Sequence, residues 1–197
     1  MDYLQSHRNF KIEIEDTQNA QLTLGQTLSP PEGWIPLHTK RIHGVFAIQI
    51  KVSIQIANGI YKSDGWFTLD SGSSAPLVMN KSFFDKLVRY SVPAKGVCFV
   101  QQSGVNGETT CAQVLQNVSI RVHDVTTDSH VVDVVSPVLC NDTDTTGVDG
   151  YAGLELIATW KGMFANEKTV WIPGSPNKMT IPPSFFNRVE ADYCERM

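Results

Sequence analysis

The residues of this 197-residue chain best suited to chemistry lie in one short segment, FTLDSGSSA at positions 67–75. Its first residues are typical of a buried strand, and a glycine among serines is typical of a tight turn. An aspartate at the junction of strand and turn lies at the mouth of a sheet, where backbone amides and hydroxyl groups can hold its carboxylate. We therefore take Asp70 as the candidate catalytic carboxylate, supported by the loop residues Ser71, Gly72 and Ser73.

The segment resembles the catalytic loop of the retropepsin-like aspartic peptidases. An alternating strand pair precedes it, and a hairpin with glycines at its tip follows it, with arms at about Val97 to Gln101 and Thr109 to Val114. In the family, such a hairpin is the flap that covers the substrate. The resemblance therefore implies a flap made by Ser103, Gly104, Val105, Asn106 and Gly107.

A later segment, Val148 to Leu154, matches the glycine-containing segment that passes beside the catalytic loop in that family and supports it from behind. Its matching residues here are Asp149, Gly150, Gly153 and Leu154. The order of these features agrees with the family from about Phe46 to Met179, which is most of the chain. The resemblance implies an endopeptidase that acts on peptide or protein substrates and needs no cofactor.

Aspartic peptidase chemistry requires two carboxylates: one activates a water molecule, and the other, protonated, hydrogen-bonds the substrate carbonyl. This chain offers one aspartate in the required setting, since Asp64-Gly65 and Asp149-Gly150 lack the following hydroxyl residue and glycine. The second carboxylate is then most simply Asp70 of an identical chain across a twofold axis. The sequence therefore predicts a homodimer.

Serine chemistry is an alternative, because the same loop echoes the Gly-Asp-Ser-Gly-Gly motif of chymotrypsin-like proteases and would make Ser71 a nucleophile. Leu69 replaces the glycine before the aspartate, and His38 and His43 lie too close upstream for a complete first barrel to separate them from Ser71. The remaining histidine candidates, His123 and His130, flank a turn and are interpreted as surface polar residues.

A second alternative is a domain of the same fold without catalysis. Such a chain would bind peptides without cleaving them, or it would be one lobe of a larger bilobal protease whose second lobe supplies the other carboxylate. Measuring the mass of the particle in solution separates these readings from the dimeric enzyme.

Metal sites are not indicated by the residue spacing. The four cysteines, at positions 98, 111, 140 and 194, lack the paired spacing of a zinc site. The polar stretch from Asn141 to Gly147 starts like a calcium loop, but its twelfth position is Gly153 where a bidentate glutamate is required. We expect a solvated loop there and no metal.

The composition bears on partners and location. Sixteen Lys and Arg against twenty Asp and Glu give a net charge of −4, which provides no basic surface for nucleic acid. No apolar run is long enough to span a membrane. The chain is expected to be soluble, and it starts without the apolar core of a signal peptide, so secretion would require that a signal had been removed.

Period-two alternation of apolar and polar residues predicts a mainly β fold. The resemblance implies a retropepsin-like closed antiparallel β-barrel with one or two short helices, one after Gly153 and a smaller one near Phe83. Residues 1–40 are expected to form an N-terminal extension, an extra hairpin packed on the barrel, and residues 41–197 the protease domain.

The turn of the flap hairpin decides which residues face the cysteines on its arms. A turn at Gly104-Val105 would set Cys98 opposite Cys111, whereas a turn at Asn106-Gly107 would set Cys98 opposite Leu115. We favour the Asn-Gly turn and free thiols.

Overall fold

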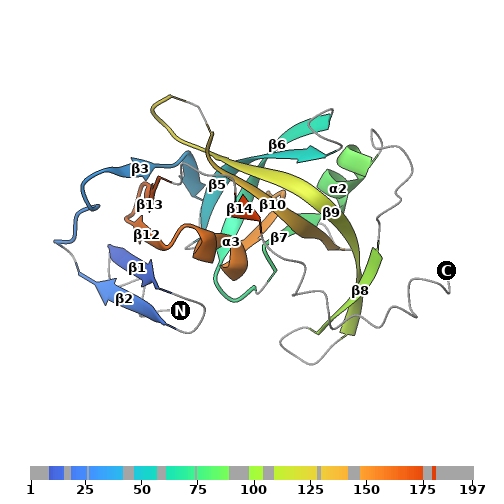
Figure 1. The fold of residues 1–197 in the computed structure, drawn as a ribbon, viewed down its shortest axis with the longest axis horizontal. Helices are drawn as coiled ribbons and strands as arrows, with labels where there is room; N and C mark the ends of the chain where they lie inside the picture. Colours follow the sequence, from blue (N-terminus) through green and yellow to red (C-terminus); the bar gives the residue numbers. More distant parts are fainter. Residues whose placement is uncertain are drawn as a thin grey trace.

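The computed structural model describes residues 9–15, 19–25, 27–41, 47–56, 61–73, 75–88, 98–103, 109–127, 130–141, 147–174 and 179–180. The strands in order along the chain are β1 (Phe10–Ile14), β2 (Ala20–Leu24), β3 (Trp34–Pro36), β4 (Thr39–Arg41), β5 (Ile48–Ile56), β6 (Tyr61–Asp70), β7 (Leu77–Asn80), β8 (Cys98–Ser103), β9 (Thr109–His123), β10 (His130–Asn141), β11 (Gly150–Gly153), β12 (Gly162–Ala165), β13 (Val170–Pro173) and β14 (Met179–Thr180). Among these described residues, two helices, α2 (Lys81–Val88) and α3 (Leu154–Thr159), interrupt the strands (Figure 1).

The larger sheet carries the candidate catalytic segment. Its strand order is β14-β10-β7-β11-β6-β5-β9-β8, with β4 added to β5 and a further pairing of β9 with β10. The pairing of β5 with β6 is antiparallel, whereas β11 runs parallel to β6 and β10 runs parallel to β7. The sheet is therefore mixed.

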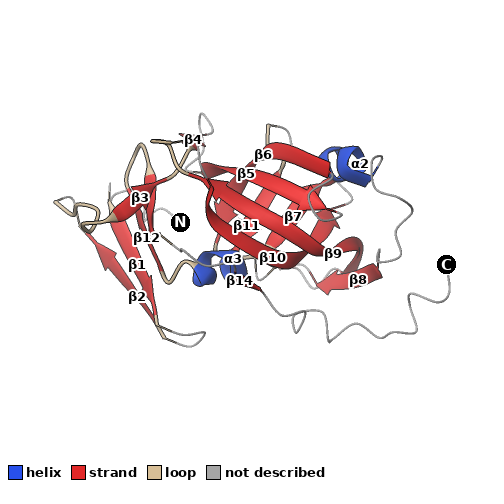
Figure 2. Ribbon diagram, turned by 45° about the horizontal axis from the view of Figure 1, so that its top comes forward, coloured by secondary structure: helices blue, strands red, loops and turns tan. Residues whose placement is uncertain are grey.

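The smaller sheet lies beside the larger one and has the order β2-β1-β12-β13-β3 (Figure 2). The N-terminal hairpin of β1 and β2 supplies two of its strands, and β12 and β13 come from the last quarter of the chain. Its inner face joins the common core through Met163, Ala165, Val170 and Ile172. The N-terminal residues thus share a sheet with a segment far away in the sequence.

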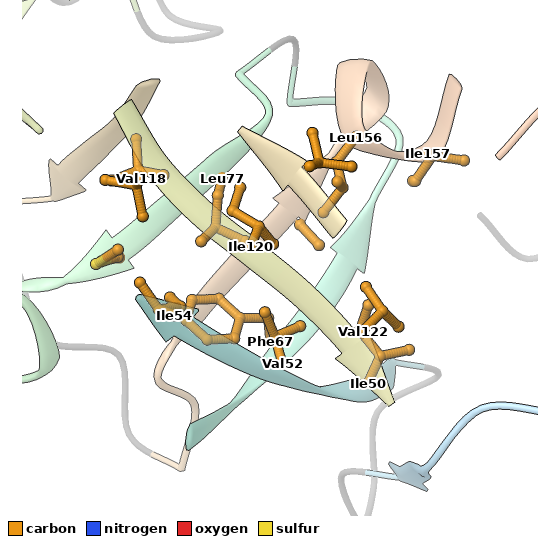
Figure 3. Close-up of a cluster of buried hydrophobic side chains, with 14 of the residues drawn as sticks. Ile50, Val52, Ile54, Phe67, Leu77, Val118, Ile120, Val122, Leu156 and Ile157 are labelled. Carbon is orange, nitrogen blue, oxygen red and sulfur yellow. The ribbon is translucent and has the colours of Figure 1, made fainter. Parts of the chain in front are cut away.

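The core lies between the strands of the larger sheet and α3. Ile50, Val52 and Ile54 of β5 meet Ile120 and Val122 of β9, and α3 adds two further side chains (Figure 3). All five of these strand residues have no solvent exposure. A fully buried side chain of this size contributes about 1.5–3 kcal/mol, so this cluster fixes the strands that lead to Asp70.

Helix α2 packs against the strand that carries the candidate site. The Phe83 ring meets the Phe67 ring edge-on, with centroids 5.4 Å apart. Gly65 leaves room for this contact, because a Cβ there would lie 2.7 Å from the Phe83 ring. The helix thus braces β6 three to five residues before Asp70.

The prediction of a closed antiparallel β-barrel is wrong, although the mainly β class is confirmed. The strands divide between two sheets, neither closed into a barrel, and the larger sheet contains parallel pairs. Period-two alternation reports which face of a strand is buried but not the direction of its neighbours. The two helices lie where they were expected, but α2 near Phe83 is the longer, with eight residues against six.

Both predicted registers of the β8–β9 hairpin are wrong. Cys98 pairs with Val114, and Gln101 pairs with Cys111, so the two cysteines are not opposite each other. This register is one residue away from the one expected for an Asn-Gly turn, and the connection spans the five residues 104–108, which lie outside the described residues. Cys140 is buried and takes part in no disulfide.

Within the described ranges, the helices are all too short to cross a membrane.

Candidate active site

Asp70 is the last residue of β6, and the turn that follows holds its carboxylate. The Gly72 amide donates a hydrogen bond to Asp70 Oδ1 at 2.9 Å, and the Ser73 amide donates to the Asp70 carbonyl at 3.2 Å. Asp70 itself is half-buried, whereas Ser71 and Gly72 are exposed. The carboxylate is therefore fixed through one oxygen and can be reached from solvent.

Strand β11 supports this loop from the side of the sheet. It lies between β6 and β7, parallel to β6, with Gly153 at the register position of Asp70. The Leu154 amide donates to the Ser73 carbonyl at 2.7 Å, and the Gly153 amide donates to the Pro76 carbonyl at 3.1 Å. Two hydrogen bonds therefore tie the end of β11 to the segment that follows Asp70.

Close backbone approach explains the two glycines of β11. A Cβ on Gly153 would lie 1.9 Å from the Ala75 carbonyl oxygen, and a Cβ on Gly150 would lie 2.0 Å from the Val78 carbonyl oxygen. Gly150 also has a φ of 156°, which side chains rarely allow. The spacing of these glycines thus follows from the insertion of β11 between two strands.

Asp149 holds neighbouring strands together through its carboxylate and its backbone. Its carboxylate accepts a hydrogen bond from the Trp66 amide at 2.8 Å, and its own amide donates to the Trp66 carbonyl at 3.0 Å. Its carbonyl accepts from the Asn80 amide at 2.9 Å. These bonds clamp β6 to β7 just ahead of β11.

Glu155 is a carboxylate near the candidate site that sequence reasoning did not single out. It follows Leu154 in the first turn of α3, and its Oε2 is buried without a hydrogen-bond partner. Burial raises the pKa of Glu155 above that of an exposed glutamate. The ionised form is therefore disfavoured in the folded chain.

Replacing Glu155 by Gln is expected to raise the melting temperature at neutral pH. A raised folded pKa means that the native state binds the proton more tightly, so the wild type loses stability as the pH rises from the unfolded pKa through the folded one. The amide has no charge to desolvate. Thermal melts of both proteins at neutral pH and below the unfolded pKa, near pH 4, measure this. The gain in melting temperature should be present at neutral pH and absent at the lower pH. An equal gain at both would contradict the assignment to ionisation.

The flap residues are only partly described. Ser103 ends β8, while Gly104, Val105, Asn106 and Gly107 lie outside the described residues. The hairpin that would carry them is present and projects from the sheet (Figure 1). Its relation to Asp70 stays a prediction.

The histidine interpretation requires a correction. His123 is buried, with 7% exposure, and its Nε2 lies 2.5 Å from Ser53 Oγ. This serine–histidine contact joins neither Ser71 nor any part of the Asp70 loop, and Ser53 has no solvent exposure, so a substrate cannot reach it. Period-two alternation indicates which face of its own strand each side chain occupies. It does not show that β5 and β9 are neighbours, and this pairing is what brings Ser53 and His123 together. His43 lies outside the described residues.

Metal-binding geometry is absent from the described part of the chain, where no three His, Cys, Asp or Glu side chains converge. The stretch that starts like a calcium loop falls largely, at residues 142–146, outside those ranges. Comparison of the chain with models of known protein families and with curated proteins gave no match. The case for function therefore rests on the geometry around Asp70.

Proposed function

We propose that this chain is an aspartic endopeptidase in which Asp70 provides one carboxylate of the catalytic pair. The observation that carries the proposal is the Asp70 turn itself. Its carboxylate is held by the Gly72 amide at the end of β6, stays accessible, and is backed by β11 through the Gly153 and Leu154 amides. A preorganised carboxylate on a braced turn is what water activation requires.

The second carboxylate is proposed to be Asp70 of a second copy, in a homodimer with its twofold axis at this turn. Two carboxylates about 3 Å apart share a proton because both cannot ionise. The ionised one takes a proton from water, which attacks the scissile carbonyl carbon. The protonated one donates to the carbonyl oxygen, which gives a tetrahedral intermediate. The C–N bond then breaks as the first carboxyl passes the proton taken from water to the nitrogen, which leaves as the amine, and the proton on the former carbonyl oxygen returns to the second carboxylate. The proposed substrate is an extended peptide, and the reaction uses no cofactor.

Mechanism-directed inhibition tests the proposed chemistry. Cleavage of a peptide by the purified chain should be blocked by an analogue whose scissile amide is replaced by hydroxyethylene, which mimics the tetrahedral intermediate. The matched control is the same peptide with an ethylene linkage at that position, which is uncharged and lacks the hydroxyl group. A phosphonylating reagent directed at serine should leave the rate unchanged. Inactivation by that reagent, with labelling of Ser71, would replace the proposal with serine chemistry.

A chain that binds the analogue but cleaves no peptide at any concentration would instead be the silent peptide-binding domain. Full activity from particles with the mass of a single chain would also contradict the dimer.

A further inference from the structure

A cleft opens on the smaller sheet, which is built from β1, β2 and β3 together with β12 and β13 (Figure 2). Its volume is about 500 Å³. The side chains that line it include Glu13, Glu15, Gln21, Trp34 and Lys161. The Leu154 amide at the start of α3 donates to the Ser73 carbonyl beyond the Asp70 turn, whereas Lys161 follows the other end of that helix. The cleft therefore lies at the far end of α3 from the proposed catalytic turn.

An indole ring forms an apolar wall of this cleft. Trp34 begins β3, yet its ring extends across β13 to β12, where a Cβ on Gly162 would lie 2.8 Å from Trp34 Cη2. Glycine at position 162 is what lets the ring lie against the strand. Trp34 is half-buried, so part of its ring is open to the cleft.

Two polar side chains share the face of the sheet on which this ring lies. Glu13 of β1 pairs directly with Gly162 of β12 and with Gln21 of β2. Residues directly opposite each other in antiparallel strands have their side chains on the same face. Glu13 and Gln21 therefore lie on the side where the Trp34 ring covers Gly162.

Lys161 brings an ammonium group to the cleft from the end of α3. Its φ is 58°, the left-handed conformation that favours glycine after a helix. Its carbonyl accepts a hydrogen bond from the Ile14 amide at 3.0 Å, which ties this residue to β1. A lysine in a conformation that costs free energy, beside a cleft, points to a role for its side chain.

The charges of the described residues around the cleft cancel. Glu13 is paired with Lys11, whose Nζ lies 2.9 Å from Glu13 Oε2. Glu15 and Lys161 add one charge of each sign. These residues therefore provide no net charge that would select an anion or a cation, and they suit a neutral ligand with many hydrogen-bonding groups.

A pyranose saccharide has the chemistry that these groups require. The C–H groups on one side of its ring are apolar and pack on an indole, while its hydroxyl groups both donate and accept hydrogen bonds. A carboxylate accepts, an ammonium donates, and a glutamine amide does both. The volume of about 500 Å³ is within the range of small-molecule sites, roughly 300–1,000 Å³.

We propose that this cleft binds a neutral pyranose oligosaccharide, one ring of which stacks on Trp34. The hydroxyl groups of the saccharide are held by Glu13, Gln21 and Lys161. Glu15 adjoins residues 16–18, which lie outside the described residues, and is assigned no contact with the ligand. The site does not depend on the proposed peptidase function, because binding is measured without a peptide substrate.

Calorimetric titration of the full chain with cellotriose and with chitotriose tests this site. Both are neutral trisaccharides with equatorial ring substituents, and at least one should bind with a Kd of about 1 mM or tighter. Raising the NaCl concentration from about 0.05 to about 0.5 M should change this affinity less than about twofold, because a neutral ligand has no charge to screen. Arginine amide, a cationic probe, should not bind.

Two substitutions locate the binding in the cleft. Trp34→Ala should weaken it at least about 20-fold, and Trp34→Phe, which keeps an aromatic ring, should weaken it less. Lys161→Gly removes the ammonium and relieves the left-handed conformation, so it should weaken binding about tenfold while raising the melting temperature. Lys168→Gly removes an exposed lysine outside the cleft and is the matched control, with unchanged affinity.

No heat of binding from either trisaccharide at about 10 mM would overturn the proposal. Wild-type affinity in Trp34→Ala or in Lys161→Gly would overturn it as well, since the ligand would then bind elsewhere. Binding of arginine amide that weakens with salt, with no binding of saccharide, would make the cleft a cation site instead.

Discussion

Replacing Asp70 by Asn is expected to lower the rate of peptide hydrolysis at least about 1000-fold. The amide has nearly the shape of the carboxylate but cannot take a proton from water or share an ionisation with a second carboxylate. Folding should survive, because the Asn Oδ1 can still accept the Gly72 amide hydrogen bond that the carboxylate accepts at 2.9 Å. Initial rates on a peptide substrate and a thermal melt measure the two effects.

Asp85→Asn is the matched control for this substitution. Asp85 is a half-exposed aspartate on α2, paired with Lys81 at 3.0 Å, and an exposed helix pair of this kind contributes only about 0.3–0.5 kcal/mol. The control should keep the wild-type rate. Hydrolysis by the Asp70→Asn chain at a rate near that of the control would remove Asp70 from the mechanism.

Gly153→Ala is expected to abolish hydrolysis and to destabilise the fold by at least about 3 kcal/mol. The added Cβ would lie 1.9 Å from the Ala75 carbonyl oxygen and 2.6 Å from the Ser73 carbonyl oxygen, and both are backbone atoms. The φ of Gly153 is −93°, which alanine adopts freely, so the effect isolates the clash from backbone strain. Denaturant unfolding and the cleavage rate measure it.

Gly25→Ala serves as the control for adding a methyl group. A Cβ there would meet a single flexible side chain, with Leu28 Cγ at 3.2 Å, so the change in stability should stay within about 1 kcal/mol. If Gly153→Ala were as stable and as active as this control, β11 would not be the support of the catalytic turn.

The Asp70 turn could be predicted from the sequence because its signals are local. An apolar run, an aspartate, and a glycine among serines occupy adjacent positions, and the structure places the end of β6 at Asp70 followed by a turn. The parallel insertion of β11 beside β6 is not a local property. The four residues of β11 do not encode the direction of their neighbours, and the supporting role of Val148 to Leu154 was predicted from the resemblance to a family and not from periodicity.

Other features depend on pairings that no single segment encodes. The sequence indicates a surface polar residue at His123, because the histidine lies beside a turn. In the structure, β9 places it against Ser53, where it is buried. The smaller sheet joins β1 to β12, about 150 positions later, so the sequence of the N-terminal hairpin could not reveal its partner. The hairpin register shifted by one residue because a five-residue connection, and not a two-residue turn, joins β8 to β9.

Mixing wild-type with Asp70→Asn chains tests most directly whether two copies build one site. At constant total concentration and one wild-type chain in ten, random pairing leaves about 1% of dimers with both aspartates. If two copies build the site, the hydrolysis rate should fall to about this fraction of the all-wild-type rate, as the square of the wild-type share. A rate of about 10%, in proportion to the wild-type share, would show that a single chain suffices and would contradict the shared pair.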